Sequence, residues 1–379
     1  MNNFTYQSPT KLVFGKEVVN ELGDAVQQYG RKVLLIYGSG SIKRNGAYND
    51  VMKQMNEIGA EVYEYSGIKS NPLHSDADEA AELGREKKVD LVLAVGGGSV
   101  IDTAKAVAMT VPVDHSCWEF YNKSRLPQTA LPMINVLTLA ATGTETNMFT
   151  VIQNQEEKLK VSVVSPLLYP KYAFLDPQYT FTVPRNYTAY GISDLVAHSL
   201  EVFFGKGEST LSDKYVYAII KEAVEYGPLL LNDLHNYELR AKIMLAATMA
   251  LNGITMIGKE HGDWGVHAIG HVLSVLYDVP HGASLSVAYP AWLKYHKKKA
   301  AVRIAELGQN IFGTNNAEDS IEALQNFFAG IGSPVNLSQL DQPGIDADEI
   351  LRTLIRNKAS GFHYKLDKGD LKEIVSLFR

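Results

Sequence analysis

The chain has 379 residues, of which 46% are hydrophobic and 21% are charged, and its formal net charge is −6 at pH 7. That length is enough for two domains with a large core, and the negative charge argues against nucleic acid as a partner and favours small-molecule ligands. Cys117 is the only cysteine, which excludes an intrachain disulfide and a thiolate zinc site and favours a reducing cytoplasm. The N-terminal stretch shows no apolar signal core and no run is long enough to cross a bilayer, so we expect no membrane association.

Strand and helix patterns alternate through the first half of the chain. Strands are expected at 11–14, 33–37, 61–65, 89–95 and 131–140, and helices at 47–58, at 75–88, from about Glu17 and from about Val100. This alternation is typical of a parallel α/β sheet with right-handed crossovers. Shorter strands around a charged turn are expected between residues 151 and 175.

The pattern changes to helices at about residues 177–184. Further helices are expected at 187–204, 209–227, 236–258, 262–277, 284–297, 299–311, 317–331 and 346–358, separated by Gly and Pro. We therefore predict two domains, an α/β domain over 1–180 and an all-helical domain over 181–379.

The strand–turn–helix unit at 89–108 carries the strongest phosphate-binding signal. Its strand runs directly into the sequence GGGS at 96–99, and a helix follows. Glycines allow close backbone approach, and the N-terminus of a helix attracts anions. Ser99 and Asp102 also have the spacing of a capping box. The glycines could serve only the turn and Ser99 only the cap, but three consecutive glycines exceed what a turn needs, which favours pyrophosphate binding.

A second nucleotide contact is expected at the turn that ends the strand over 33–37, formed by Gly38, Ser39, Gly40 and Ser41. An acidic residue there would select NAD by holding the ribose 2′-hydroxyl, and this turn has none. Its serines can donate to a 2′-phosphate instead, with Lys43 and Arg44 close by, so the turn favours NADP(H) over NAD(H). The sequence TGTETN at 142–147 follows another strand and could line the nicotinamide or the diphosphate.

Two stretches in the helical half carry metal-ligand residue types at helical spacing. His267 and His271 are four residues apart, so they lie on one face of a helix, and His281 follows at a Pro–Gly turn. Asp194 and His198 repeat this spacing on another helix with apolar neighbours, where a buried carboxylate must be paired or bind a cation. Core or surface histidines beside an exposed Asp–His pair are the alternative. The apolar neighbours favour a site of three or four N/O ligands, suited to Zn²⁺ or Fe²⁺.

Four motifs together resemble the iron-containing (group III) alcohol dehydrogenase family: GGGSVID at 96–102, TGTETN at 142–147, GISDLVAHSLE at 191–201 and HAIGHVLSVLYDVPHG at 267–282. The likeness covers nearly the whole chain and is greatest to the NADPH-dependent butanol dehydrogenase or broad-range aldehyde reductase branch. It implies a dehydroquinate synthase-like fold, with an N-terminal dinucleotide-binding α/β domain and an all-helical C-terminal domain. Thr146 stands where many members have serine, which is a small departure.

The resemblance also implies roles for individual residues. It assigns one divalent metal ion, Fe²⁺ or Zn²⁺, to Asp194, His198, His267 and His281, and it makes His271 a catalytic pocket residue that is not a ligand. Spacing alone does not decide that point. The resemblance places the cofactor against Gly38, Ser39, Ser41, Gly97, Gly98, Ser99, Asp102, Thr138, Thr142, Asn147, Lys160 and Tyr179.

The implied reaction is hydride transfer between NADP(H) and a short-chain alcohol or aldehyde. A homodimer is expected, in which the strand at 11–15 could pair across a two-fold axis. A glycerol-dehydrogenase-like polyol oxidoreductase would need more polar residues facing the metal. A dehydroquinate-synthase-like enzyme would need a basic cluster in the helical half, and the only one, KYHKKK at 294–299, is interpreted as a solvated helix face.

Two alternatives come from other classes. A metal-dependent hydrolase of a phosphorylated compound would explain the metal ligands and the GGGS turn, but not the rest of the α/β half. A catalytically silent nucleotide-binding protein would be expected to have lost at least one metal ligand.

Overall fold

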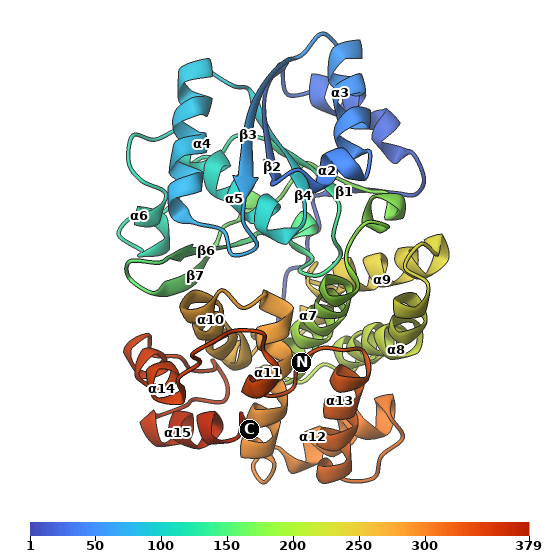
Figure 1. The fold of residues 1–379 in the computed structure, drawn as a ribbon, viewed down its shortest axis with the longest axis vertical. Coiled ribbons are helices and arrows are strands. Elements are labelled where there is room, and N and C mark those ends of the chain that lie inside the picture. The colour runs from blue at the N-terminus through green and yellow to red at the C-terminus, as the bar shows by residue number, and fades with distance from the viewer. Residues whose placement is uncertain (379) are drawn as a thin grey trace. The chain divides into compact units, whose positions relative to one another are not determined.

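The chain forms two compact units in the computed structural model, which describes residues 1–378 (Figure 1). The α/β unit consists of Gln7–Val183 and Leu234–Thr248, and the helical unit of Met1–Tyr6, Pro184–Asp233 and the residues from Met249 onward. The main division lies close to the change of pattern near residue 180. Residues 1–6 belong to the helical unit and residues 234–248 belong to the α/β unit, and the sequence pattern predicted neither assignment.

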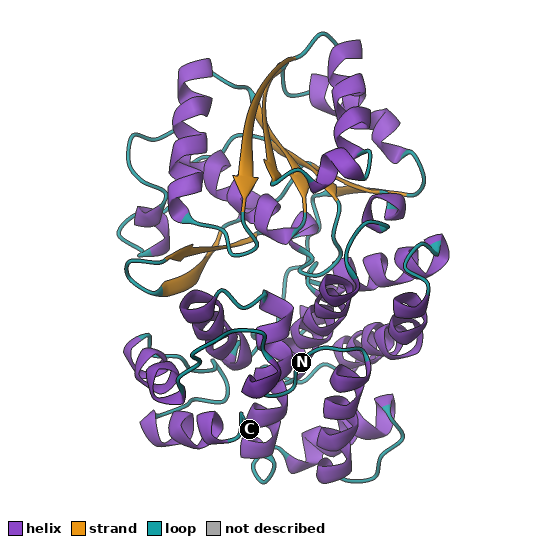
Figure 2. Cartoon of the chain, in the orientation of Figure 1, coloured by secondary structure: helices purple, strands orange, loops and turns teal. Residues whose placement is uncertain are grey.

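The α/β unit is built on a six-stranded sheet in which all neighbouring strands are parallel (Figure 2). In spatial order its strands are β1 (Lys11–Phe14), β8 (Tyr172–Leu175), β5 (Met133–Leu137), β4 (Leu91–Gly96), β2 (Lys32–Gly38) and β3 (Glu61–Ile68). A separate antiparallel hairpin is formed by β6 (Phe149–Asn154) and β7 (Leu159–Val164). The predicted parallel α/β sheet is confirmed.

Helices cover both faces of this sheet, which explains why its central strands are apolar without interruption. The helices of the unit are α1 (Leu22–Gln27), α2 (Ser41–Arg44), α3 (Ala47–Glu57), α4 (His74–Lys87), α5 (Gly98–Thr110), α6 (Trp118–Tyr121) and most of α9 (Tyr237–Ala250). Successive residues of β2 alternate between two apolar clusters. Leu34 and Ile36 pack with α4 and α5, whereas Val33 and Leu35 pack with α1 and α3.

The helical unit is organised around α7, which is buried on all sides from Gly191 to Phe203. Its helices are α7 (Arg185–Phe203), α8 (Thr210–Asn232), α10 (Gly265–Tyr277), α11 (His281–His296), α12 (Ala301–Ile311), α13 (Ala317–Gly330), α14 (Ala347–Arg356) and α15 (Lys368–Ser376). Both α8 and α11 pack against α7, and α10 packs against α11. Because α7 is buried on all sides, its polar side chains Asp194, His198 and Glu201 lie in the interior of the helical unit.

The differences from the sequence prediction include one helix start, one helix end and one helix that was not predicted. The helix α11 begins at His281 rather than at 284, because the carbonyl of Pro280 already accepts the first helical hydrogen bond, so His281 belongs to a helix and not to a turn. The helix α9 ends well before residue 258, since Gly253 adopts a left-handed φ of 96°. The helix α15 was not predicted, although a capping box between Asp367 and Asp370 marks its start.

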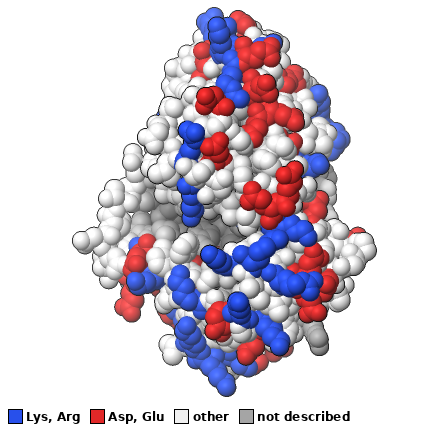
Figure 3. Space-filling model, turned by 90° about the vertical axis from the view of Figure 1, so that its left-hand side faces the viewer, with Lys and Arg blue, Asp and Glu red and all other residues white. Residues whose placement is uncertain are grey.

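Within residues 1–378, no helix has the length and the apolar run that a membrane crossing requires. On the face shown in Figure 3, Asp and Glu side chains gather in the upper part of the view beside Lys and Arg side chains, and Lys and Arg prevail in the lower part. Both signs of charge are therefore present on this face.

Candidate functional site

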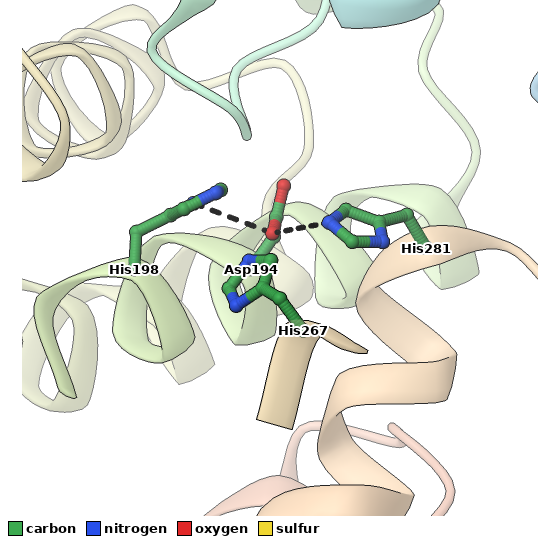
Figure 4. Close-up of side chains that lie close together, drawn as sticks. All are labelled: Asp194, His198, His267 and His281. Carbon is green, nitrogen blue, oxygen red and sulfur yellow. Dashed lines mark ion pairs between the residues drawn. The ribbon is translucent and has the colours of Figure 1, made fainter. Parts of the chain in front are cut away.

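The four predicted metal ligands lie together in the helical unit (Figure 4). Asp194 and His198 come from α7, His267 comes from α10, and His281 is the first residue of α11. One ligand atom from each side chain lies within 4.8 Å of the others. The Asp194 Oδ1 atom is 3.4 Å from Nδ1 of His198 and 3.6 Å from Nε2 of His281. Ligand atoms about 2.0–2.2 Å from one ion in tetrahedral geometry are about 3.3–3.6 Å apart, so the two spacings from Asp194 fit a shared metal ion.

Close packing of α11 against α7 brings His281 to Asp194. Gly282 lies directly after His281, and a Cβ atom added to it would be 2.0 Å from the carbonyl oxygen of Tyr190 on α7. Only glycine permits the two backbones to approach this closely. The lack of a side chain at Gly282 therefore helps to set the position of His281 relative to the Asp194 carboxylate.

The protonation states around the cluster also suit a metal ion. Burial, followed by the proximity of His267, holds the pKa of His198 well below its usual value, so this imidazole is neutral, as a ligand must be. The Nδ1 atom of His267 lies 2.8 Å from a carboxylate oxygen of Glu201. When the Glu201 carboxyl is ionised it accepts from Nδ1–H of His267, and in that tautomer the Nε2 lone pair is available to a metal. One carboxylate and three neutral imidazoles around a divalent ion carry a net charge of +1.

Glu201 contacts a predicted metal ligand and was missed in the sequence analysis. It is 1% exposed, and burial raises the pKa of its carboxyl to about 8, although the backbone N–H groups of His267, Trp264 and Val266 favour its ionised form. The available signal was its spacing, because it lies seven residues after Asp194 and therefore on the same face of α7 as Asp194 and His198.

His271 lies beside the cluster but is not one of its four members. Its ring centroid is 5.5 Å from that of His281 and 6.2 Å from that of His267, and its side chain is half-buried. This placement agrees with a pocket residue near the metal. Its catalytic role stays a prediction.

The glycine turn of the α/β unit packs against the loop that follows β5. Gly97 precedes α5 and Gly98 is the first residue of that helix. A Cβ atom on Gly98 would lie 2.6 Å from Oγ1 of Thr142, and one on Gly97 would lie 3.1 Å from Cβ of Leu139. The glycines thus bring Thr142 to the N-terminus of α5, where an anion is favoured.

The predicted capping box at the start of α5 is not formed. The Ser99 hydroxyl donates to the carbonyl of Ser70 at 2.5 Å instead of capping the helix. Asp102 accepts from the hydroxyl of Thr144 at 2.6 Å and from the backbone N–H of Val151 at 3.0 Å. Both residues are therefore used in contacts with other segments of the chain, which sequence spacing within one helix could not show.

A buried lysine, also missed from the sequence, holds the TGTETN segment. The Lys105 ammonium has five acceptors at 2.7–3.1 Å: the carbonyls of Thr144, Asn147 and Phe149 and the side-chain oxygens of Thr144 and Asn147. Burial lowers the pKa of Lys105 to about 7, and the negative charges of Asp102 and Glu145 oppose that shift. The signal in the sequence was a lysine within the mostly apolar helix that follows the glycine turn.

The carboxyl ends of β2 and β4 enclose a position at which open α/β sheets bind ligands. In the sheet, β2 has β3 on one side and β4 on the other, so the strand order reverses between β2 and β4. The helices α3 and α5 cover opposite faces of the sheet. Nucleotides bind in the crevice at such a reversal of strand order. Gly38 ends β2, Gly96 ends β4, and the backbone N–H of Thr138 after β5 donates to the Gly96 carbonyl at 2.9 Å.

The remaining predicted cofactor residues are placed by contacts within the α/β unit. Gly40 adopts a φ of 107°, and α2 begins at Ser41, so Ser39 and Ser41 flank a left-handed glycine. Lys160 donates to the Asn71 side chain at 2.8 Å. The Tyr179 hydroxyl donates to the Asp50 carboxylate at 2.8 Å, and the Asn147 side-chain amide donates to the Gly143 carbonyl at 3.0 Å.

A nucleotide-binding sheet and a centre of one carboxylate and three imidazoles are the parts of a metal-dependent dehydrogenase. Residues 9–177 match the family model described as iron-containing alcohol dehydrogenase, and residues 188–378 match the C-terminal model of the Fe-containing alcohol dehydrogenase family. The chain belongs to the iron-containing alcohol dehydrogenase family. It is an NAD(P)-dependent enzyme of the butanol dehydrogenase and aldehyde reductase branch of that family, as its relatives indicate.

The chain is 39% identical over 384 residues to the probable NADH-dependent butanol dehydrogenase 1 of Bacillus subtilis, covering 99% of each chain. It is 33% identical over 364 residues to the NADPH-dependent aldehyde reductase YqhD of Escherichia coli, covering 93% of each. The crystal structure of NADH-dependent butanol dehydrogenase A from Thermotoga maritima matches with a TM-score of 0.96 and 38% identity, covering 100% of this chain and 99% of that one. These matches confirm the fold and favour a dehydrogenase over the hydrolase and the silent-protein alternatives.

Proposed function

We propose that the protein reduces short-chain aldehydes to alcohols with NADPH in preference to NADH, using one divalent metal ion at the cluster of Asp194, His198, His267 and His281. The observation that carries the metal-dependent part is the convergence of these four ligand types within 4.8 Å. The observation that carries the preference for NADPH is the turn after β2, which lacks a carboxylate from Gly38 to Ser41.

The argument for NADPH rests on charge at the end of β2. An enzyme selects NAD when a carboxylate accepts from the ribose 2′-hydroxyl, and that carboxylate repels a 2′-phosphate. Here Ser39 and Ser41 supply hydroxyl donors, and the Lys43 ammonium lies 4.7 Å from the Tyr48 ring centroid and 5.4 Å from that of Tyr37. An ammonium held over two rings at this edge supplies a counter-charge for a phosphate. Relatives whose names specify NADH and NADPH both occur, so the preference is a property to be measured on this chain.

In the proposed reaction, a bound divalent metal supplies a Lewis acid that polarises the carbonyl group, and NADPH supplies the hydride. The protein's own groups hold and orient these parts. Asp194 contributes the only charge among the four ligands, which leaves the site positive toward the oxygen of a reacting carbonyl. His271 is proposed to give a proton to that oxygen as the alcohol forms.

The identity of the metal is also part of the proposal. A set of one carboxylate and three imidazoles accepts both Fe²⁺ and Zn²⁺, so the metal bound in a cell follows supply as much as affinity. Fe²⁺ is proposed because the family models are described by iron.

The cofactor contacts are proposed at the carboxyl ends of β2, β4 and β5. The diphosphate would lie against Gly97, Gly98 and Ser99, since the N-terminus of α5 provides free N–H groups there. Other contacts are proposed for Gly38, Ser39, Ser41, Asp102, Thr138, Thr142, Asn147, Lys160 and Tyr179. Among these, Asp102 would act through Thr144 and the β6 backbone, because both of its oxygens contact those groups.

A homodimer is also proposed. The strand β1 is an outer strand of the sheet and pairs with β8. An outer strand offers backbone groups that a second copy can pair with across a two-fold axis. Light scattering coupled to size-exclusion chromatography would show twice the 41.8 kDa chain mass, and a monomer at micromolar concentration would contradict this proposal.

The decisive test is NADPH oxidation with butanal, in which metal-stripped protein is compared with protein refilled with Fe²⁺ or Zn²⁺. Metal-dependent turnover is expected, with a kcat/KM for NADPH above that for NADH. Lys43→Ala should raise the KM for NADPH about tenfold, as for the loss of one charge-assisted hydrogen bond, and leave the KM for NADH unchanged. Lys53→Ala, which removes an exposed lysine from the adjacent helix α3, is the matched control. Equal use of both cofactors, or no effect of Lys43→Ala, would contradict the NADPH proposal.

A further inference from the structure

Glu201 continues the line of ligands along α7. Asp194, His198 and Glu201 follow the spacing i, i+4, i+7, so they lie on one face of that helix. Glu201 is 1% exposed although it is not a member of the metal cluster. A carboxylate so deeply buried needs strong hydrogen-bond donors to offset the loss of hydration.

Those donors all come from the start of α10. One Glu201 oxygen accepts from the backbone N–H of His267 at 2.9 Å and from Nδ1 of the same residue at 2.8 Å. The carboxylate also accepts from the backbone N–H groups of Trp264 and Val266. A single side chain on α7 therefore binds the N-terminus of α10 and the imidazole of its third residue.

We propose that Glu201 is the positioning residue that fixes His267 for metal binding, an inference that rests on the proposed metal site. Its carboxylate holds the proton on Nδ1 of His267 and sets both the rotation of the ring and the place of the helix that carries it. The metal-facing Nε2 atom is then oriented before any ion binds. Carboxylate partners of ligating histidines typically account for about 10–100-fold in metal affinity.

A neighbouring carboxylate provides a matched control. Asp263 is fully buried and also binds the start of α10, accepting from the backbone N–H of Gly265 at 3.2 Å. Its other oxygen accepts from the backbone N–H groups of His363 and Tyr364 at 2.9 and 2.6 Å. These contacts are to backbone groups, so Asp263→Asn tests the loss of a carboxylate that binds the start of α10 without contacting the ligand imidazole.

The experiment measures the Zn²⁺ dissociation constant of the metal-stripped full-length protein by calorimetry, with thermal unfolding and NADPH binding as checks on folding. Glu201→Gln is expected to weaken Zn²⁺ binding about 10–100-fold while NADPH binding is kept. Asp263→Asn is expected to lower the melting temperature of the metal-free protein and to change the Zn²⁺ dissociation constant less than threefold. If Glu201→Gln does not fold, Glu201→Asp keeps the charge but withdraws it by one methylene, and an intermediate loss of affinity is expected.

If Glu201 acts by positioning the His267 ring, its effect on Zn²⁺ affinity should disappear when that ring is absent. A merely structural role of Glu201 would not require this. In a His267→Gln background the ring is absent, so adding Glu201→Gln should change Zn²⁺ affinity less than threefold. Equal Zn²⁺ affinity of wild type and Glu201→Gln, or the same loss in both backgrounds, would overturn the inference. If the wild type itself bound no Zn²⁺, Fe²⁺ or Co²⁺, the proposed metal site would fail first, which is a separate outcome.

Discussion

Replacing Lys105 by methionine tests whether one buried ammonium holds the TGTETN segment in place. Methionine fills nearly the same volume, so the main loss is electrostatic. The ammonium has five oxygen acceptors within 3.1 Å, and the buried carboxylates of Asp102 and Glu145 lie close enough to influence its pKa. Removing one partner of a buried charged group typically costs about 3–5 kcal/mol, because the remaining charges stay buried.

Hydrogen–deuterium exchange followed by mass spectrometry measures this loss locally, which suits a protein of two units that need not unfold together. We expect the segment from Thr144 to Phe149 to exchange at least about 100-fold faster in Lys105→Met, as about 3 kcal/mol implies. The affinity for NADPH should fall, whereas Zn²⁺ binding in the helical unit should not. If exchange in this segment rose less than about fivefold, or about 1 kcal/mol, the segment would be stable without the Lys105 ammonium, and the proposed role of Lys105 would be refuted.

Three further predictions follow from contacts near the metal cluster and from one buried histidine. Gly282→Ala should destabilise by about 1–3 kcal/mol and weaken Zn²⁺ binding, since its Cβ would clash with the Tyr190 carbonyl, whereas Gly330→Ala has open space and should be nearly neutral in thermal unfolding. Zn²⁺ at about 100 times its dissociation constant should stabilise the wild type by about 2.7 kcal/mol, and Asp194→Asn should lose most of that gain in a thermal-shift assay. Burial lowers the pKa of His296 to about 4, so between about pH 6.5 and 4 the unfolded chain binds a proton that the folded chain does not. As the pH is lowered from about 6.5 to 4, the free energy of unfolding of the metal-free wild type should therefore fall by about 3 kcal/mol more than that of His296→Gln. An equal fall for both proteins in urea-unfolding experiments would contradict this assignment.

The sequence was sufficient for features that depend on local spacing. Alternating strands and helices predicted the parallel sheet, and the i, i+4 pair of Asp194 and His198 predicted that two ligands share a helix face. Spacing could not decide whether His271 is a ligand, because His267 and His271 share one face of α10 equally well. The decision depends on how α10 meets α7 and α11, and that is a tertiary property. The resemblance to a known family supplied it in advance.

The supporting residues were missed for a related reason. Glu201 contacts a residue 66 positions away in the chain, and Lys105 contacts residues 39 or more positions away. A local sequence pattern cannot identify partners at such distances. The Ser99 and Asp102 pair shows the opposite error, because its spacing suggested a local cap while both side chains contact other segments. Buried charges within apolar helices are the signal that could have identified Glu201 and Lys105, since such charges need a partner somewhere in the fold.

The division of the chain into units has a consequence for how the protein can be made and altered. The backbone passes from one unit to the other four times, after Tyr6, Val183, Asp233 and Thr248. A truncation at residue 180 would remove Met244 from an apolar cluster of the α/β unit, and it would remove the Thr248 hydroxyl that donates to the buried Glu145 carboxylate at 2.6 Å. A fusion at a single junction near residue 180 would therefore separate residues 234–248 from the rest of the α/β unit. A chimaera that exchanges the α/β unit would have to carry residues 234–248 together with residues 7–183.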